Sequence, residues 1–229
     1  MRISMLSVGL CTSLAGCGSA TISEPGRGSS TLDVGAHITV INQVPNAASA
    51  DQFATALSAR LTKAGAPLHG AAVTIASSKG DVVLVEQDPT GNHADYAGEQ
   101  AGYAQAYTLT ARLGDDYIEG VSLSGPDVHS FSVPALAAQV AYGQPLVVEW
   151  SPSGATLATL ETRELNPLDV PDTGSYSVPG SGLRKPDPGK TQDERVRVTR
   201  SSTVNIAGGT AGSDLTVTVR NEVTFLVVN

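Results

Sequence analysis

Runs of alternating hydrophobic and polar residues recur along the chain, and Gly, Pro, Asn and Asp separate them. In residues 195–206, for example, Val196, Val198, Val204 and Ile206 share one parity, and polar residues take the other. A period of two places every second side chain on the same face of a β-strand. Short strands separated by turn residues are typical of an all-β sandwich or barrel.

The predicted strands cover most of the chain after residue 35. They lie at residues 36–44, 52–63, 72–75, 82–86, 103–112, 117–123, 146–150, 156–163, 174–178, 195–206 and 214–228. The segment 52–63 also fits a helix, because its hydrophobic residues recur every four positions, but the turn residues that follow it favour a strand. The last predicted strand carries Asn221 at a hydrophobic position, which predicts a tight turn or a bulge there.

The aromatic residues include candidates for the core and for the surface. Trp150, the only tryptophan, shares a parity with the hydrophobic residues of its predicted strand, which places it in the core of the sandwich. Tyr96 and Tyr103 flank a predicted turn at residues 98–100. They are therefore the candidates for contact with a ligand at the surface.

The N-terminus has the layout of a secretory signal peptide, with one positive charge, a short apolar run and small residues after it. The run ends in Leu14, Ala15, Gly16 and Cys17, which resemble the lipobox of bacterial lipoproteins. The resemblance implies a signal peptide at residues 1–16, recognition of the three residues before Cys17 by the signal peptidase, and acylation of Cys17, for example with palmitate. The alternative is an ordinary signal peptide in which the cysteine occurs by chance.

The resemblance to lipoproteins also bears on location. Residue 18 is Gly, whereas Asp at that position retains enteric lipoproteins in the inner membrane. The outer membrane is therefore favoured, on its periplasmic face or at the cell surface. Residues 17–35 are rich in Gly, Ser and Pro, which predicts a flexible tether. Because Cys11 lies in the segment that would be removed, the mature chain is expected to contain no disulfide.

Three pieces of the sequence resemble the transthyretin-like or carboxypeptidase-regulatory type of Ig-like sandwich. They are K-A-G-A-P-L at residues 63–68, G-A-A-V-T-I at 70–75 and Y-T-L-T-A at 107–111. Ala111 departs from the pattern, which has Val there. The resemblance implies a fold and no catalytic residue. A Pro-containing crossing near residue 131 predicts two Ig-like domains, at residues 36–131 and 132–229.

The charge and the motifs narrow the classes of function. The formal net charge is −8 and no basic run is present, which argues against nucleic acid as a partner. The histidines His37, His69, His93 and His129 are scattered, and the acidic segment at 88–95 has the composition of a turn rather than the spacing of a calcium loop. We therefore expect no metal and no cofactor, and the absence of a catalytic motif predicts that the chain is not an enzyme.

These observations predict a lipid-anchored, exported envelope protein that acts as a non-catalytic binding or structural module. The whole chain resembles lipoproteins of the Gram-negative envelope. Its expected partners are the membrane, through the lipid anchor, and a protein or a glycan of the envelope. The alternative is a carbohydrate-binding or accessory module that works with a separate hydrolase.

Overall fold

The computed structural model describes residues 22–155 and 157–229, and this part of the chain is all-β apart from two short 3₁₀ turns. The strands are β1 (Ser23–Gly28), β2 (Leu32–Asn42), β3 (Phe53–Lys63), β4 (Ala66–Pro67), β5 (Ala72–Ser77), β6 (Val82–Glu86), β7 (Asp95–Ala101), β8 (Ala106–Leu113), β9 (Asp116–Ser124), β10 (Ser130–Val133), β11 (Gln139–Ala141), β12 (Leu146–Ser151), β13 (Leu157–Thr162), β14 (Leu168–Val170), β15 (Ser175–Val178), β16 (Gln192–Asn205) and β17 (Asp214–Val228). The 3₁₀ turns are η1 (Ala50–Gln52) and η2 (Gly180–Gly182).

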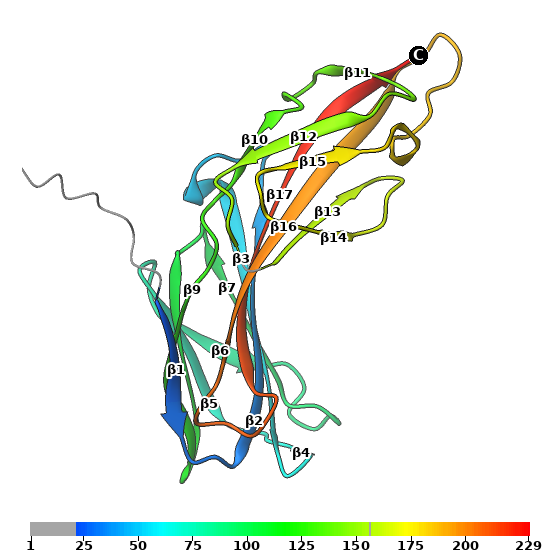
Figure 1. Ribbon diagram of the computed structural model, residues 1–229. Coiled ribbons are helices and arrows are strands. Elements are labelled where there is room, and N and C mark those ends of the chain that lie inside the picture. The colour runs from blue at the N-terminus through cyan, green and yellow to red at the C-terminus, as the bar shows by residue number, and fades with distance from the viewer. Residues whose placement is uncertain (1–21, 156) are drawn as a thin grey trace, which may run out of the picture.

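Most strands belong to one large mixed sheet. Its order is β1-β9-β8-β5-β6-β7-β3-β2-β17-β16-β13-β14, with β4 beside β3 and β11 beside β17. Strand β17 pairs in parallel with β2 and with β11, and the other pairs of the sheet are antiparallel. A second sheet has the order β10-β12-β15. Figure 1 shows an elongated molecule along which the hairpin β16–β17 runs.

Two clusters of buried hydrophobic residues follow one another along the molecule. The N-terminal core lies where the large sheet folds over on itself, and it includes Ile38, Leu57 and Leu109. The C-terminal core contains buried residues of β13, β16 and β17 and of the three-stranded sheet, including Trp150 and Phe225. The predicted burial of Trp150 is confirmed, because its side chain is 3% exposed. The fold is all-β and β-sandwich-like.

The hairpin β16–β17 contributes to both cores. Val217 and Val219 of β17 belong to the N-terminal core, whereas Val223 and Phe225 belong to the C-terminal core. The pairing of the two strands is continuous from Gln192↔Val227 to Asn205↔Asp214. Strand β17, near the C-terminus, therefore pairs with β2 and supplies side chains to the N-terminal core. The domain boundary near residue 131 stays a prediction.

Asn221 lies on β17 between the residues of the two cores, and it is fully buried. Its Nδ2 donates to the carbonyl oxygens of Ala47 and His129, at 2.7 and 2.6 Å, and its Oδ1 accepts from the backbone N–H of Ala47 at 3.2 Å. The predicted turn or bulge at Asn221 is therefore wrong. The strand stays regular because backbone groups of two other segments satisfy the side chain.

Arg200 occupies the corresponding place on β16, between Val198 of the C-terminal core and Val204 of the N-terminal core. Its Nε lies 2.8 Å from Oδ2 of Asp172, and both side chains are 2% exposed. Asp172 also accepts from Nε1 of Trp150 at 2.8 Å. Burial raises the pKa of Asp172, but the hydrogen bonds that it accepts outweigh this effect and hold the pKa below its usual value.

His129 completes this layer. The ring is fully buried, and its Nε2 lies 3.1 Å from the carbonyl oxygen of Val198. Because a carbonyl oxygen only accepts, Nε2 is the protonated nitrogen and donates this hydrogen bond. Burial, and then the charge of Arg200, lower the pKa of His129 to about 3, and the ring is therefore neutral at neutral pH. We call Asn221, Arg200, Asp172 and His129 the polar junction.

The predicted tether at residues 17–35 is wrong from residue 23 onward. Residues Ser23–Gly28 form β1, which pairs with β9, and β2 begins at Leu32. Two glycines of this segment, Gly26 and Gly28, are required by close packing. A Cβ on Gly26, whose φ is +69°, would lie 2.6 Å from a methyl carbon of Val121, and a Cβ on Gly28 would lie 2.4 Å from a backbone oxygen.

We expect Asn221→Ala to lower the free energy of unfolding by about 2–4 kcal/mol, because it leaves buried backbone groups of Ala47 and His129 without their partner. Asn205→Ala is the matched control, since Asn205 is exposed near the end of β16, and it should change stability by less than about 0.5 kcal/mol. Urea unfolding measures both. Equal effects of the two substitutions would contradict the role given to Asn221.

Candidate functional site

The two tyrosines predicted at the surface lie in the N-terminal core. Tyr96 is 1% exposed and Tyr103 is 4% exposed. The hydroxyl of Tyr96 donates to the carbonyl oxygen of Leu68 at 2.7 Å, and that of Tyr103 donates to the carbonyl oxygen of Pro126 at 2.7 Å. Burial raises the pKa of Tyr103. The predicted exposure of these tyrosines is therefore wrong, because the segment taken as a turn is strand β7 with Tyr96 on its inner face.

The other predicted site residues lie outside the described part of the chain. They are Leu14, Ala15, Gly16 and Cys17, and their roles stay predictions. In residues 22–155 and 157–229, no helix is long and apolar enough to cross a membrane. The same residues contain no group of three or more His, Cys, Asp or Glu side chains placed to hold a metal ion.

A polar pocket of about 460 Å³ lies at one end of β13 in the C-terminal half. We call it the arginine pocket, because Arg163, Arg184 and Arg195 line it. The three arginines come from the turn after β13, from the segment after η2 and from β16. The remaining lining residues are Glu161, Thr162, Glu164, Leu165, Asn166 and Pro167.

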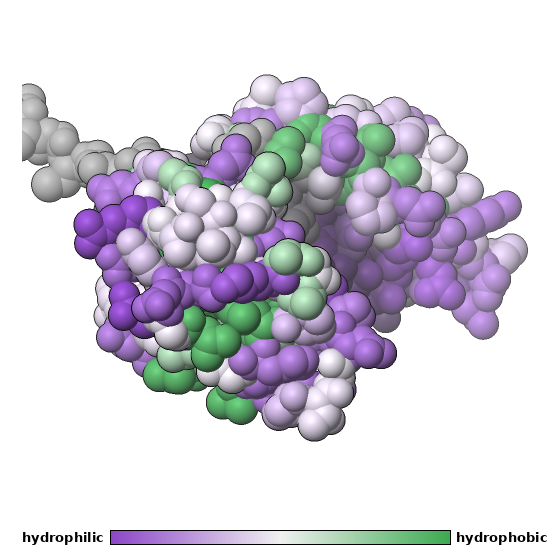
Figure 2. All heavy atoms as spheres, turned by 90° about the horizontal axis from the view of Figure 1, so that it is seen from below, coloured by the Kyte–Doolittle hydropathy of each residue, from purple (hydrophilic) through white to green (hydrophobic). Residues whose placement is uncertain are grey.

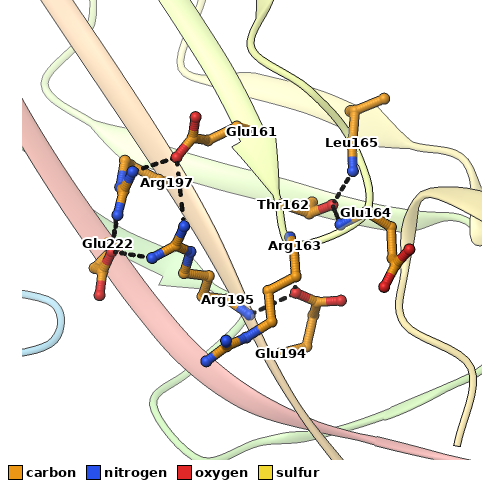
Figure 3. Close-up of polar contacts among 9 residues, drawn as sticks. All are labelled: Glu161, Thr162, Arg163, Glu164, Leu165, Glu194, Arg195, Arg197 and Glu222. Carbon is orange, nitrogen blue, oxygen red and sulfur yellow. Dashed lines mark hydrogen bonds and ion pairs between the residues drawn. The ribbon is translucent and has the colours of Figure 1, made fainter.

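Glu194 holds the backbone of all three arginines. Its carboxylate is fully buried and accepts the backbone N–H of Arg163 at 3.0 Å, of Arg184 at 2.7 Å and of Arg195 at 2.8 Å. Figure 3 shows Glu194 beneath the turn that carries Arg163. Hydrogen bonds to an ionised acceptor are stronger than neutral ones, so they offset part of the cost of burying the charge. One carboxylate of β16 thus holds the turn after β13 and the segment after η2 against its own strand.

Thr162 determines the shape of the turn at the edge of the pocket. Its hydroxyl donates to the carbonyl oxygen of Gly182 at 2.5 Å and accepts the backbone N–H of Glu164 at 3.2 Å and of Leu165 at 2.9 Å. The side chain is 5% exposed. These bonds join the turn after β13 to η2, and they position Arg163 and Arg184 on neighbouring walls of the same pocket.

A group of four charged side chains lies next to the pocket on the outer face of the large sheet. Glu161, Arg197 and Glu222 stand opposite one another on β13, β16 and β17. Arg197 is paired with Glu161, and its Nη2 lies 2.9 Å from Glu222. Arg195 contacts the same two carboxylates at longer distances, 3.8 and 3.6 Å (Figure 3). Arg197 therefore takes the close ion pairs, and Arg195 is held loosely.

The arginines of the pocket differ in how well they are paired. The buried Nε of Arg195 has no hydrogen-bond partner within the described residues. For Arg163 and Arg184, the contacts found in residues 22–155 and 157–229 involve the backbone N–H and no carboxylate at the guanidinium. These groups keep donors that a ligand with several oxygen atoms can use.

Other surfaces offer weaker sites. A pocket of about 570 Å³ lies over β2, β3 and β7, but its main charged groups, Arg60 and Asp95, are paired with each other at 2.6 Å. On β6, Val83 and Val85 are each 66% exposed. Figure 2 views the molecule from the end of its N-terminal half, where hydrophilic residues separate small hydrophobic patches. Small isolated patches are ordinary on soluble proteins. The arginine pocket is therefore the candidate site.

We expect Glu194→Gln to lower the free energy of unfolding by about 2–3 kcal/mol, because a neutral amide cannot accept three backbone N–H groups as strongly as a carboxylate. Glu164→Gln changes the same chemical group at an exposed position of the same pocket. It should change stability by less than about 0.5 kcal/mol. Thermal or urea unfolding of both variants tests this role, and a Glu194→Gln chain as stable as the Glu164→Gln chain would refute it.

Comparison with known proteins gives no match, since neither a protein-family model nor a curated protein matches the chain. The functional argument therefore depends on the residues and the geometry described above.

Proposed function

We propose that the chain is an exported, lipid-anchored protein of the cell envelope that acts as a non-catalytic binding module. In this proposal the two halves are Ig-like β-sandwich domains, and the arginine pocket is the binding site. The observation that carries the proposal is the continuous hairpin β16–β17, which enters both cores and bears Arg195 near the end far from the N-terminal core.

The rigid connection between the two halves supports this function. Strand β1 starts near the middle of the elongated molecule (Figure 1), where Ser23 pairs with Leu123 of β9, and the arginine pocket lies at an end of β13 in the C-terminal half. A lipid at Cys17 would hold the N-terminal half at the membrane. The hairpin and the polar junction would then fix the pocket relative to the anchored half, and a rigid scaffold favours binding because little order has to be gained on contact.

The candidate aromatic residues of the carbohydrate-binding alternative are not available at the surface. Binding of a neutral sugar commonly uses exposed aromatic rings, and Tyr96, Tyr103 and Trp150 are all buried. The arginine pocket instead favours a charged ligand, because guanidinium groups bind oxyanions in bidentate geometry.

The lipid anchor is tested at Cys17. We expect Cys17→Ser to abolish the incorporation of labelled palmitate and to move the protein out of the membrane fraction or leave it as uncleaved precursor, because a hydroxyl is a much poorer nucleophile than a thiolate. Cys11→Ser is the matched control, since Cys11 lies in the segment expected to be removed. A Cys17→Ser chain that still takes up palmitate, or a cleaved one that stays at the membrane, would remove the basis of the anchored function.

A further inference from the structure

We infer that the arginine pocket binds the phosphate group of a phosphorylated polar ligand. The inference deepens the proposed binding function and rests on it. Three arginines line the pocket together with Glu161 and Glu164, and the carboxylate of Glu194 lies buried behind them, in a chain whose formal net charge is −8. The arginines and glutamates of the site balance in number, so an anion would be bound by the exposed guanidinium groups of Arg163 and Arg184 rather than by a net positive charge.

The number of free donors favours phosphate over carboxylate. Arg163 and Arg184 have guanidinium groups without a carboxylate partner among the described residues, and the guanidinium of Arg195 lies 3.8 and 3.6 Å from Glu161 and Glu222, too far for a hydrogen bond. A phosphate monoester carries a charge of about −1.5 to −2 at pH 7 and has three acceptor oxygens. A carboxylate has one charge and two oxygens. Three arginines around one pocket therefore match a phosphate better.

The site is organised before a ligand enters. Glu194 binds the backbone of all three arginines, and Thr162 joins the two loops that carry Arg163 and Arg184. The loops therefore need little reordering when an anion binds, which reduces the entropy cost of binding. Only the arginine side chains have to move onto the phosphate.

The neighbouring ion pairs leave Arg195 able to move toward a bound anion. Arg197 lies between Glu161 and Glu222, with the closer contacts to both. Arg195 shares the same carboxylates at 3.8 and 3.6 Å, distances beyond a hydrogen bond. Arg195 can therefore turn toward an anion while Arg197 keeps both glutamates paired.

The size and the polarity of the pocket indicate more than a bare ion. Its volume of about 460 Å³ lies within the range of about 300–1,000 Å³ that is typical of sites for small molecules. Its lining contains charged and amide side chains and no aromatic residue. A phosphorylated saccharide has both the charge and the hydroxyl groups that such a lining can bind. Free phosphate has the same phosphate oxygens but lacks the saccharide hydroxyl groups.

The inference is tested by calorimetric titration of the purified full chain with glucose 1-phosphate, inorganic phosphate and glucose at low ionic strength. We expect glucose 1-phosphate and inorganic phosphate to bind and glucose not to bind. Tighter binding of glucose 1-phosphate identifies a phosphorylated saccharide as the ligand class, and equal binding identifies phosphate itself. Both outcomes support the site. Binding of neither phosphate compound, or equal binding of glucose, overturns it.

The matched variants are Arg184→Gln and Lys185→Gln. Each removes one positive charge from an exposed side chain, and the two residues are adjacent in sequence. Only Arg184 lines the arginine pocket. Arg184→Gln should weaken phosphate binding by about tenfold or more, and Lys185→Gln by less than about twofold. Equal weakening would show attraction by net charge alone and would overturn the site. The backbone N–H of residue 184 remains in both variants, and circular dichroism checks the fold. If the chain takes up palmitate at Cys17 but binds no phosphate, the phosphate site is wrong, whereas the lipid-anchored function is still supported.

Discussion

A strand that passes from one hydrophobic core into another must place some of its inward side chains at the boundary between them. Strand β17 does this at Asn221, and β16 does it at Arg200. The pleat gives these positions no choice of face, because every second residue points inward. The boundary is also where chain segments cross and bring backbone carbonyls and N–H groups into the interior. Buried polar groups have to be paired. Asn221 pairs the backbone groups of Ala47 and His129, and Nη1 of Arg200 donates to the carbonyl oxygen of Asp127 at 2.9 Å.

The hairpin also determines where the candidate site lies. At the end of β16 that is far from the N-terminal core, Glu194 faces inward and collects backbone N–H groups, while Arg195 faces outward into the arginine pocket. The same alternation that builds the cores therefore places a buried carboxylate and an outward guanidinium on neighbouring residues. Because β16 continues into the N-terminal core, the position of the pocket relative to the N-terminal half is fixed by the pairing of one hairpin.

The sequence carries much of the fold and little of the site. The alternation over residues 214–228 predicts β17 with its observed bounds, and the parity of Trp150 predicts its burial. The turn proposed at Asn221 fails because its partner, Ala47, is distant in the chain. Strand β7 is missed because its sequence, D-Y-A-G-E-Q-A, has no hydrophobic alternation and becomes a strand only between β3 and β6. The arginine pocket has no local motif, since its three arginines meet only in the folded chain, through the hydrogen bonds of Glu194 and Thr162.

We infer that the hairpin and the polar junction make the two halves one cooperative unit. The direct measurement is urea unfolding followed by two probes, the fluorescence of Trp150 in the C-terminal core and the backbone amide NMR signals of Leu109 and Val121 in the N-terminal core. We expect one transition with the same midpoint for both probes, because a two-state unit unfolds as a whole. Two separate midpoints, with native amide signals persisting after Trp150 has become exposed, would contradict it.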